Sequence, residues 1–71
     1  MEKKLYNRVK ELRARHNFTQ GDLANKVGVT RQTIAAVEKG EYIPSAYLAL
    51  CICSVFELPM EKVFSLEEDQ L

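Results

Sequence analysis

The chain has 71 residues, of which 46% are hydrophobic and 28% are charged, with three glycines and two prolines. We expect residues 1–71 to form a single domain, and this composition excludes disorder and collagen-like repeats. A chain this short buries only about 60% of its unfolded surface, which argues against a large enclosed active site. The longest apolar run, residues 46–53, has eight residues, whereas a membrane span needs about 20. The basic first residues are not followed by the apolar segment of a signal peptide, so we expect a cytoplasmic protein without membrane contact.

Three helices are predicted in the first 40 residues. Each begins after a residue that is a good N-cap and ends near one that tolerates a turn. The start and end residues are, in chain order, Asn7 and Asn17, Thr19 and Gly28, and Thr30 and Gly40. Asp22 lies three residues after Thr19 and completes a pair that resembles a capping box.

Two further helices are predicted in the rest of the chain. Pro44 and Ser45 start a mostly apolar helix that runs to about Phe56, and Pro59 begins a short last helix. Apolar residues 5–6 and 64–66 flank the bundle, and we expect them to pair as a minor two-stranded sheet. The predicted fold class is therefore all-α, a compact bundle of five helices.

The charges are unevenly distributed although the net charge is zero. Residues 1–40 hold nine Lys or Arg and four Asp or Glu, whereas residues 41–71 hold Lys62 against six acidic residues. Such a domain can present a basic face to phosphates and keep its acidic end away from them. Two solvated surfaces of unlike sign explain the pattern equally well.

The residues with metal-binding or catalytic potential are few. Cys51 and Cys53 are the only cysteines and His16 is the only histidine. On a helix, side chains two residues apart point in nearly opposite directions, so the cysteines cannot share a metal. The sequence also has no arrangement of nucleophile and base or of paired carboxylates. We therefore expect no metal, no cofactor and no enzymatic activity.

Residues 19–40 combine a capped helix, a tight turn and a second capped helix, which is a helix-turn-helix pattern. Here the sequence resembles the Xre family of lambda-repressor-like helix-turn-helix regulators, on the residues TQ..LA..VGV..QTI...E.G...PS. The resemblance covers residues 7–64 and implies a lambda-repressor-like bundle that binds double-stranded DNA as a transcriptional regulator, a repressor. Gly21, Cys51 and Glu57 depart from the family pattern.

The second helix of this motif carries the candidate base-reading residues Arg31, Gln32, Thr33 and Ala36. An Arg fork fits guanine O6 and N7, and a Gln amide fits adenine N6 and N7, so the Arg31–Gln32 pair suits the major groove. Thr33 can reach a phosphate or a thymine methyl, and the small Ala36 allows a close approach. The alternative for Arg31 and Gln32 is a solvated helix end.

The resemblance also implies contacts to the DNA backbone. It assigns them to Gln20, at the start of a helix whose N-terminus attracts anions, and to Lys39, Gly40 and Tyr42 in the following loop. For Tyr42, packing against the protein is the alternative.

Arg13 and Glu38 are predicted to form a structural ion pair. Each lies in an otherwise apolar helical stripe and needs a partner there. The family carries an Arg–Glu pair at these two positions.

A homodimer is expected, because one recognition helix contacts too few base pairs for useful specificity. The short last helix and its flanks hold more apolar side chains than a monomer is expected to bury. The predicted interface residues are Leu58, Met60, Val63, Phe64 and Leu66. For Val63 and Phe64, the alternative is that they cap the core. Such a dimer would bind a near-palindromic operator.

A different class of function remains open beside DNA binding. The helix-turn-helix could serve as the scaffold of a protein-interaction or antitoxin-like module. The exposed side of the second motif helix distinguishes the two. It carries Arg31, Gln32 and Lys39 and no acidic residue that points outward, which favours DNA.

Overall fold

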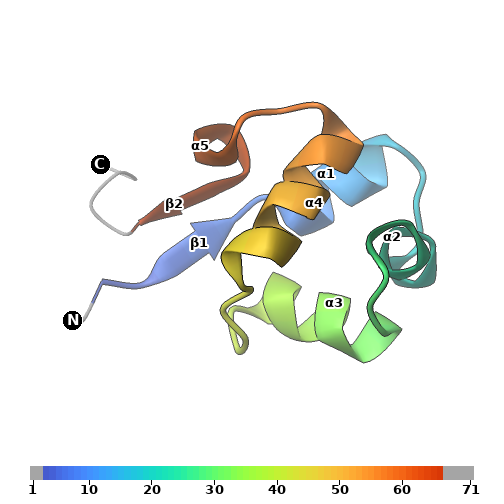
Figure 1. Cartoon of the computed structure of the whole chain (residues 1–71), viewed down its shortest axis with the longest axis horizontal. Coiled ribbons are helices and arrows are strands. Elements are labelled where there is room, and N and C mark those ends of the chain that lie inside the picture. The colour runs from blue at the N-terminus through green and yellow to red at the C-terminus, as the bar shows by residue number, and fades with distance from the viewer. Residues whose placement is uncertain (1–2, 67–71) are drawn as a thin grey trace.

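The computed structural model describes residues 3–66 and consists of five helices and a two-stranded sheet (Figure 1). The helices enclose a single core, and the sheet that joins the first and last described segments lies at one end of the bundle. This confirms the predicted fold class. No helix in the described range is long and apolar enough to cross a bilayer. The elements are, in chain order, β1 (Leu5–Asn7), α1 (Val9–Arg15), α2 (Gln20–Val27), α3 (Arg31–Lys39), α4 (Ala46–Phe56), α5 (Met60–Val63) and β2 (Phe64–Leu66).

The helix-turn-helix is delimited by the local signals that the sequence carries. The backbone N–H of Thr19 donates to Asp22 Oδ2 at 2.9 Å, and the N–H of Asp22 donates to Thr19 Oγ1 at 3.0 Å, which completes the capping box. Thr30 Oγ1 accepts from the N–H of Thr33 at 3.2 Å. Gly28 ends α2 with a φ of 77°, a left-handed conformation that glycine adopts at little cost.

The start of α1 differs from the prediction. Asn7 belongs to β1, and Arg8 takes the N-cap position without a capping side chain. Asn7 still satisfies the first turn from one residue further back, because its Oδ1 accepts from the N–H of Val9 at 3.0 Å. Its Nδ2 donates to the carbonyl of Val37 at 2.9 Å, so the same side chain ties β1 to α3. Because β1 pairs with β2, the strand extends to Asn7, the residue that the sequence predicts as the N-cap of the first helix.

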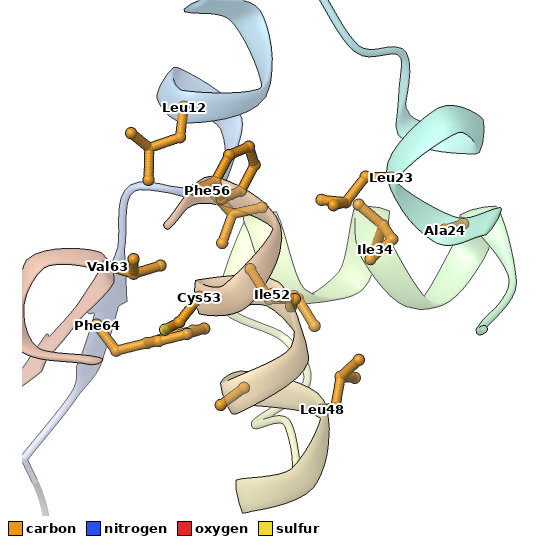
Figure 2. Close-up of a cluster of buried hydrophobic side chains, with 13 residues drawn as sticks. Leu12, Leu23, Ala24, Ile34, Leu48, Ile52, Cys53, Phe56, Val63 and Phe64 are labelled. Atoms are coloured by element: carbon orange, nitrogen blue, oxygen red, sulfur yellow. The ribbon is translucent and has the colours of Figure 1, made fainter. Parts of the chain in front are cut away.

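The core is built around α4, which lies between the other elements (Figure 2). Its buried face consists of Leu48, Ala49, Ile52, Cys53 and Phe56. Ile52 contacts the region where Leu23 of α2 and Ile34 of α3 converge, and all three are completely buried. Each large aliphatic side chain buried in this way contributes roughly 1.5–3 kcal/mol. The core therefore fixes the mutual orientation of α2 and α3.

The two-stranded sheet joins the ends of the described chain. β1 and β2 are antiparallel, with Leu5 opposite Leu66 and Asn7 opposite Phe64. The pairing continues into the N–H of Arg8, which donates to the carbonyl of Val63 at 2.9 Å. The predicted sheet is present, and it anchors the start of α1 to the end of α5.

The C-cap of α4 is a strained position that offers a test of the fold. Glu57 has a φ of 56°, in the left-handed region that disfavours residues with a Cβ. Glu57→Gly should raise the free energy of unfolding by about 0.5–1 kcal/mol, because relief of this strain outweighs the added entropy of the unfolded chain. Urea and thermal unfolding measure the change. The matched control Glu61→Gly, inside α5, should lower stability by about 1 kcal/mol, and a destabilised Glu57→Gly variant would contradict the argument.

Candidate nucleic-acid interface

Helix α3, the candidate recognition helix, presents a polar side to solvent and an apolar side to the core. Ile34 and Val37 are at most 1% exposed, whereas Arg31, Gln32 and Lys39 are exposed. At 1.5 Å per residue, this nine-residue helix is about 14 Å long, and a major groove is about 12 Å wide. The helix is therefore held from one side and free to enter a groove with the other.

The four candidate base-reading residues differ in accessibility. Arg31 and Gln32 are exposed in the first turn of α3, and Thr33 and Ala36 are half-buried. The Oγ1 of Thr33 lies 3.0 Å from the Oγ1 of Thr30, so this hydroxyl already has a partner in the N-cap. Arg31 and Gln32 are the pair with the freest access to a base edge.

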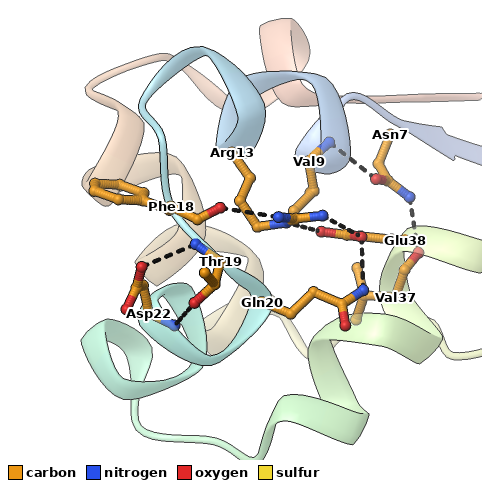
Figure 3. Close-up of polar contacts among 9 residues, drawn as sticks. All are labelled: Asn7, Val9, Arg13, Phe18, Thr19, Gln20, Asp22, Val37 and Glu38. Carbon is orange, nitrogen blue, oxygen red and sulfur yellow. Dashed lines mark hydrogen bonds and ion pairs between the residues drawn. The ribbon is translucent and has the colours of Figure 1, made fainter.

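A polar network ties α1, α2 and α3 together beneath this surface (Figure 3). Arg13 Nε lies 2.7 Å from Glu38 Oε2, and the Glu38 side chain is only 4% exposed. Arg13 Nη1 also donates to the carbonyl of Phe18 at 2.9 Å, in the turn before α2. Gln20 Nε2 donates to Glu38 Oε1 at 3.1 Å. The structure thus brings together the two residues expected to pair and adds Gln20, a third member that no spacing rule indicates.

The candidate phosphate-contacting residues lie at both ends of the motif. Gln20 and Arg31 line a surface hollow of about 550 Å³, together with Arg13 and the segment 17–21 at the start of α2. An α-helix leaves its first N–H groups without partners inside the helix, and the helix dipole makes this end attractive to anions. Arg13 is already paired with Glu38, so the groups of the hollow that suit a phosphate are the Arg31 guanidinium, the Gln20 amide and the helix N-terminus.

The second segment that is predicted to contact the DNA backbone follows α3. Gly40 ends the helix with a φ of 79°, and Lys39 precedes it in the last turn. Tyr42 is 47% exposed and lines a shallow groove with Gly40 and Pro44, so it is neither buried in the core nor fully free. Lys39, a candidate for backbone contact, lies at the opposite end of α3 from Arg31, the candidate base reader.

The basic residues of α1 are partly neutralised on the protein itself. Arg8 Nη2 and Arg15 Nη2 lie 3.1 and 2.7 Å from Glu11 Oε2, and Arg8 Nη1 donates to the carbonyl of Lys62 at 3.0 Å. The hydrogen bond from Arg8 holds the pKa of the Glu11 carboxyl below its ordinary value. Arg8 and Arg15 therefore make contacts within the protein, to Glu11 and to α5. Because Glu11 offsets part of their charge, they attract a distant polyanion less strongly than free arginines would.

Two other ionisable groups respond to their surroundings. Hydrogen bonds from the backbone and hydroxyl of Thr19 hold the pKa of Asp22 below its ordinary value, which keeps the capping box charged. Burial raises the pKa of the Cys53 thiol, whose Sγ lies 3.9 Å from Met60 Sδ. Cys53 thus acts as a core residue. Among residues 3–66, no three His, Cys, Asp or Glu side chains gather closely enough to hold a metal ion.

The C-terminal apolar surface is smaller than the sequence predicts. Val63 and Phe64 are 1% and 7% exposed because they fill the core between α4 and the sheet. Of the five predicted interface residues, Val63 is therefore part of the core, whereas Phe64 packs in the core and also lines a hollow at the surface. Leu58 and Met60 are half-buried and Leu66 is 41% exposed. A mostly apolar hollow of about 340 Å³ is lined by Leu5, Pro44, Ala49, Met60, Phe64 and Leu66, with Glu61 and Ser65 at its polar part.

A further apolar surface lies on α4 and the loop before it. Ile43, Tyr47 and Leu50 are 72%, 77% and 57% exposed, and residues 42–56 carry no charge. Tyr47 and Leu50 lie on the side of α4 that faces solvent, opposite the buried side. Helix α4 therefore has an outer face that is apolar and carries no charge.

Comparison with known proteins identifies the fold and the family. A helix-turn-helix family model matches residues 9–63. The uncharacterized HTH-type transcriptional regulator YgzD of Bacillus subtilis is 60% identical over 63 residues, which cover 89% of this chain and 96% of that protein. The uncharacterized HTH-type transcriptional regulator MJ0272 of Methanocaldococcus jannaschii is 52% identical over 64 residues, with 90% and 97% covered.

A solved structure shares the same arrangement. The restriction-modification controller protein C.AhdI from Aeromonas hydrophila superposes with a TM-score of 0.72 at 25% identity, over 78% of this chain and 83% of that one. The family matched here is one of transcriptional regulators and not of enzymes. These matches agree with the two capped helices of the structure and with the exposed polar side of α3. The chain belongs to the Xre family of lambda-repressor-like helix-turn-helix DNA-binding transcriptional regulators.

Proposed function

We propose that the protein is a cytoplasmic, sequence-specific repressor that inserts α3 into the major groove of double-stranded DNA as a homodimer. The observation that carries this proposal is the position of Arg31 and Gln32. Both are exposed at the start of a helix whose other side is anchored in the core. Binding upstream of a gene would then exclude the transcription machinery. A reporter assay in which the protein lowers transcription from its selected site tests the repressor role.

In this proposal the site residues divide into two groups. Arg31 and Gln32 read base edges, with Thr33 and Ala36 close to the groove floor. Gln20, Lys39, Gly40 and Tyr42 contact the backbone, which fixes the register of α3 but carries no sequence information. The hollow beside Gln20 and the loop after Lys39 supply two backbone-contacting segments, one from the start and one from the end of the motif in sequence.

Arg31→Ala should weaken binding to the selected site by about 1–3 kcal/mol and relax the preference at one base pair. The reason is the loss of the forked guanidinium contact to a guanine. Selection of bound sites from random DNA, followed by titration of the selected duplex, measures both effects. Lys39→Ala is the matched control, since it should weaken all sequences about equally and reduce the salt slope by about one unit. Unchanged affinity and base preference in Arg31→Ala would exclude base reading by this residue.

The proposed dimer uses the C-terminal apolar surface, defined by Leu58, Met60 and Leu66. Met60 and Leu66 border the 340 Å³ hollow, which a side chain of a second copy could fill. Three acidic residues, 67–69, lie outside the described residues and follow directly after this surface. A two-fold axis at this surface would leave both α3 helices free. They would then enter successive major grooves about 34 Å apart on a near-palindromic site.

A further inference from the structure

The Gln20 side chain extends from the start of α2 to the buried carboxylate on α3 (Figure 3). Its Nε2 donates to Glu38 Oε1 at 3.1 Å, and the same oxygen accepts from Arg13 Nη2 at 3.3 Å. The other carboxylate oxygen accepts from Arg13 Nε at 2.7 Å. Arg13 is in turn held by the carbonyl of Phe18. The amide of Gln20 is therefore attached to a rigid, buried group and not to a flexible surface side chain.

This attachment fixes how the amide can present itself. A carboxylate oxygen accepts from an N–H and repels a carbonyl oxygen, so the amide nitrogen of Gln20 must face Glu38. An amide nitrogen carries two N–H groups, and Glu38 takes only one of them. Gln20 also lines the 550 Å³ hollow, together with Arg31 and the start of α2, so the second N–H is left available to a ligand in that hollow. A side chain held in this way loses little further rotamer freedom when a ligand arrives.

We propose that Glu38 is a positioning residue for DNA binding: it orients the Gln20 amide so that its second N–H meets a backbone phosphate. Glu38 itself does not touch the DNA. Its negative charge is neutralised by Arg13 and shielded by burial, so it does not repel the phosphate. The inference rests on the proposed function, because it needs DNA bound at α3.

A double-mutant cycle in DNA affinity tests the inference. The variants Gln20→Ala, Glu38→Gln and the combination of both are titrated at one salt concentration against the duplex selected by the wild-type chain. A glutamine at position 38 has one acceptor oxygen, which cannot serve Arg13 and Gln20 as two carboxylate oxygens do. Glu38→Gln should weaken binding about tenfold when residue 20 is Gln and less than about twofold when it is Ala, the range of coupling between members of one network.

A purely structural role of Glu38 gives a different result. Once each affinity is corrected for the folded fraction measured by urea unfolding, Glu38→Gln then weakens binding equally with either residue at position 20. Asn7→Ala is the matched control, since it removes another hydrogen bond to α3, from Asn7 Nδ2 to the carbonyl of Val37, without touching Gln20. Its effect should be the same in both backgrounds.

A second replacement guards against a Glu38→Gln chain that does not fold. Replacing the buried pair by apolar residues of similar size, Arg13→Met with Glu38→Leu, often leaves stability unchanged, and it removes the acceptor of Gln20. This replacement should also weaken binding more in the chain that keeps Gln20 than in the chain that carries Gln20→Ala. Equal effects in both backgrounds, with either replacement, would overturn the positioning role. A wild-type chain that selects no sequence from random DNA would instead overturn the proposed function.

Discussion

Glu38→Ala should lower the free energy of unfolding by about 3–5 kcal/mol, because it leaves the Arg13 guanidinium half-buried without its carboxylate. The 2.7 Å contact and the 4% exposure of the Glu38 side chain place this pair well beneath the surface, where solvent screens it little. The Gln20 amide also loses its acceptor in this variant. In a chain of 71 residues such a change is a large part of the total stability. Urea unfolding followed by circular dichroism measures it.

Two further variants test whether the loss of stability comes from breaking the Arg13–Glu38 pair or from removing any negative charge. Glu41→Ala removes an exposed carboxylate three residues away and should change stability by less than about 0.5 kcal/mol. Arg13→Met with Glu38→Leu should be close to wild type, since neither charge is left without a partner. If Glu38→Ala unfolds at the same urea concentration as the wild type, the ion pair does not stabilise the fold.

Leu66→Glu should abolish the proposed dimer and lower affinity for DNA with two half-sites by about 10²–10⁴-fold. In a dimer, the second recognition helix is held close to its half-site once the first has bound, so its binding is an intramolecular event. A monomer loses this gain in affinity. The added carboxylate would face its symmetry mate and the apolar hollow beside Met60. Sedimentation at micromolar concentration should show a species of 8.1 kDa, and affinity for a single half-site should stay as in the wild type.

Tyr47→Glu is the matched control for this experiment. Tyr47 is an exposed large hydrophobic residue of α4, and it is not among the residues that line the hollow beside Met60 and Leu66. The variant adds the same charge and should leave both the dimer and the affinity unchanged. A wild-type chain that sediments as a single monomer while bound to its selected site would exclude the dimer. Loss of the dimer in Tyr47→Glu would move the interface to α4.

Much of the fold could be predicted because its determinants are local. Thr19, Gly28 and Thr30 act on backbone groups within a few residues, so their spacing alone defines the ends of α2 and the start of α3. The alternation of Ile34 and Val37 with exposed residues likewise identifies which side of α3 is free. Arg13 and Glu38 could be paired from the sequence because a charge in an apolar stripe needs a partner, and the family resemblance supplied the match.

The features that escaped prediction depend on which segments meet in space. The hydrogen bond from Gln20 to Glu38 spans 18 positions and exists only because the core sets the angle between α2 and α3. The sequence predicts the pairing of residues 5–6 with residues 64–66 but places Asn7 in a helix cap, because no local signal shows that the strand extends by one residue to pair Asn7 with Phe64. The apolar residues Val63 and Phe64 are equally suited to a core and to an interface, and only packing against α4 decides between the two.

The meeting of β1 and β2 also has a kinetic consequence. Pairing Leu5 with Leu66 closes a loop that contains nearly the whole described chain, and the entropy cost of such a closure must be met before its few contacts form. We therefore expect the sheet to form late in folding and to open by local fluctuation more readily than α4, with faster amide hydrogen exchange. The surface around Leu66 thus takes shape only after the two ends have met, so a folding intermediate that already holds α2 and α3 in place would not yet be able to pair with a second copy.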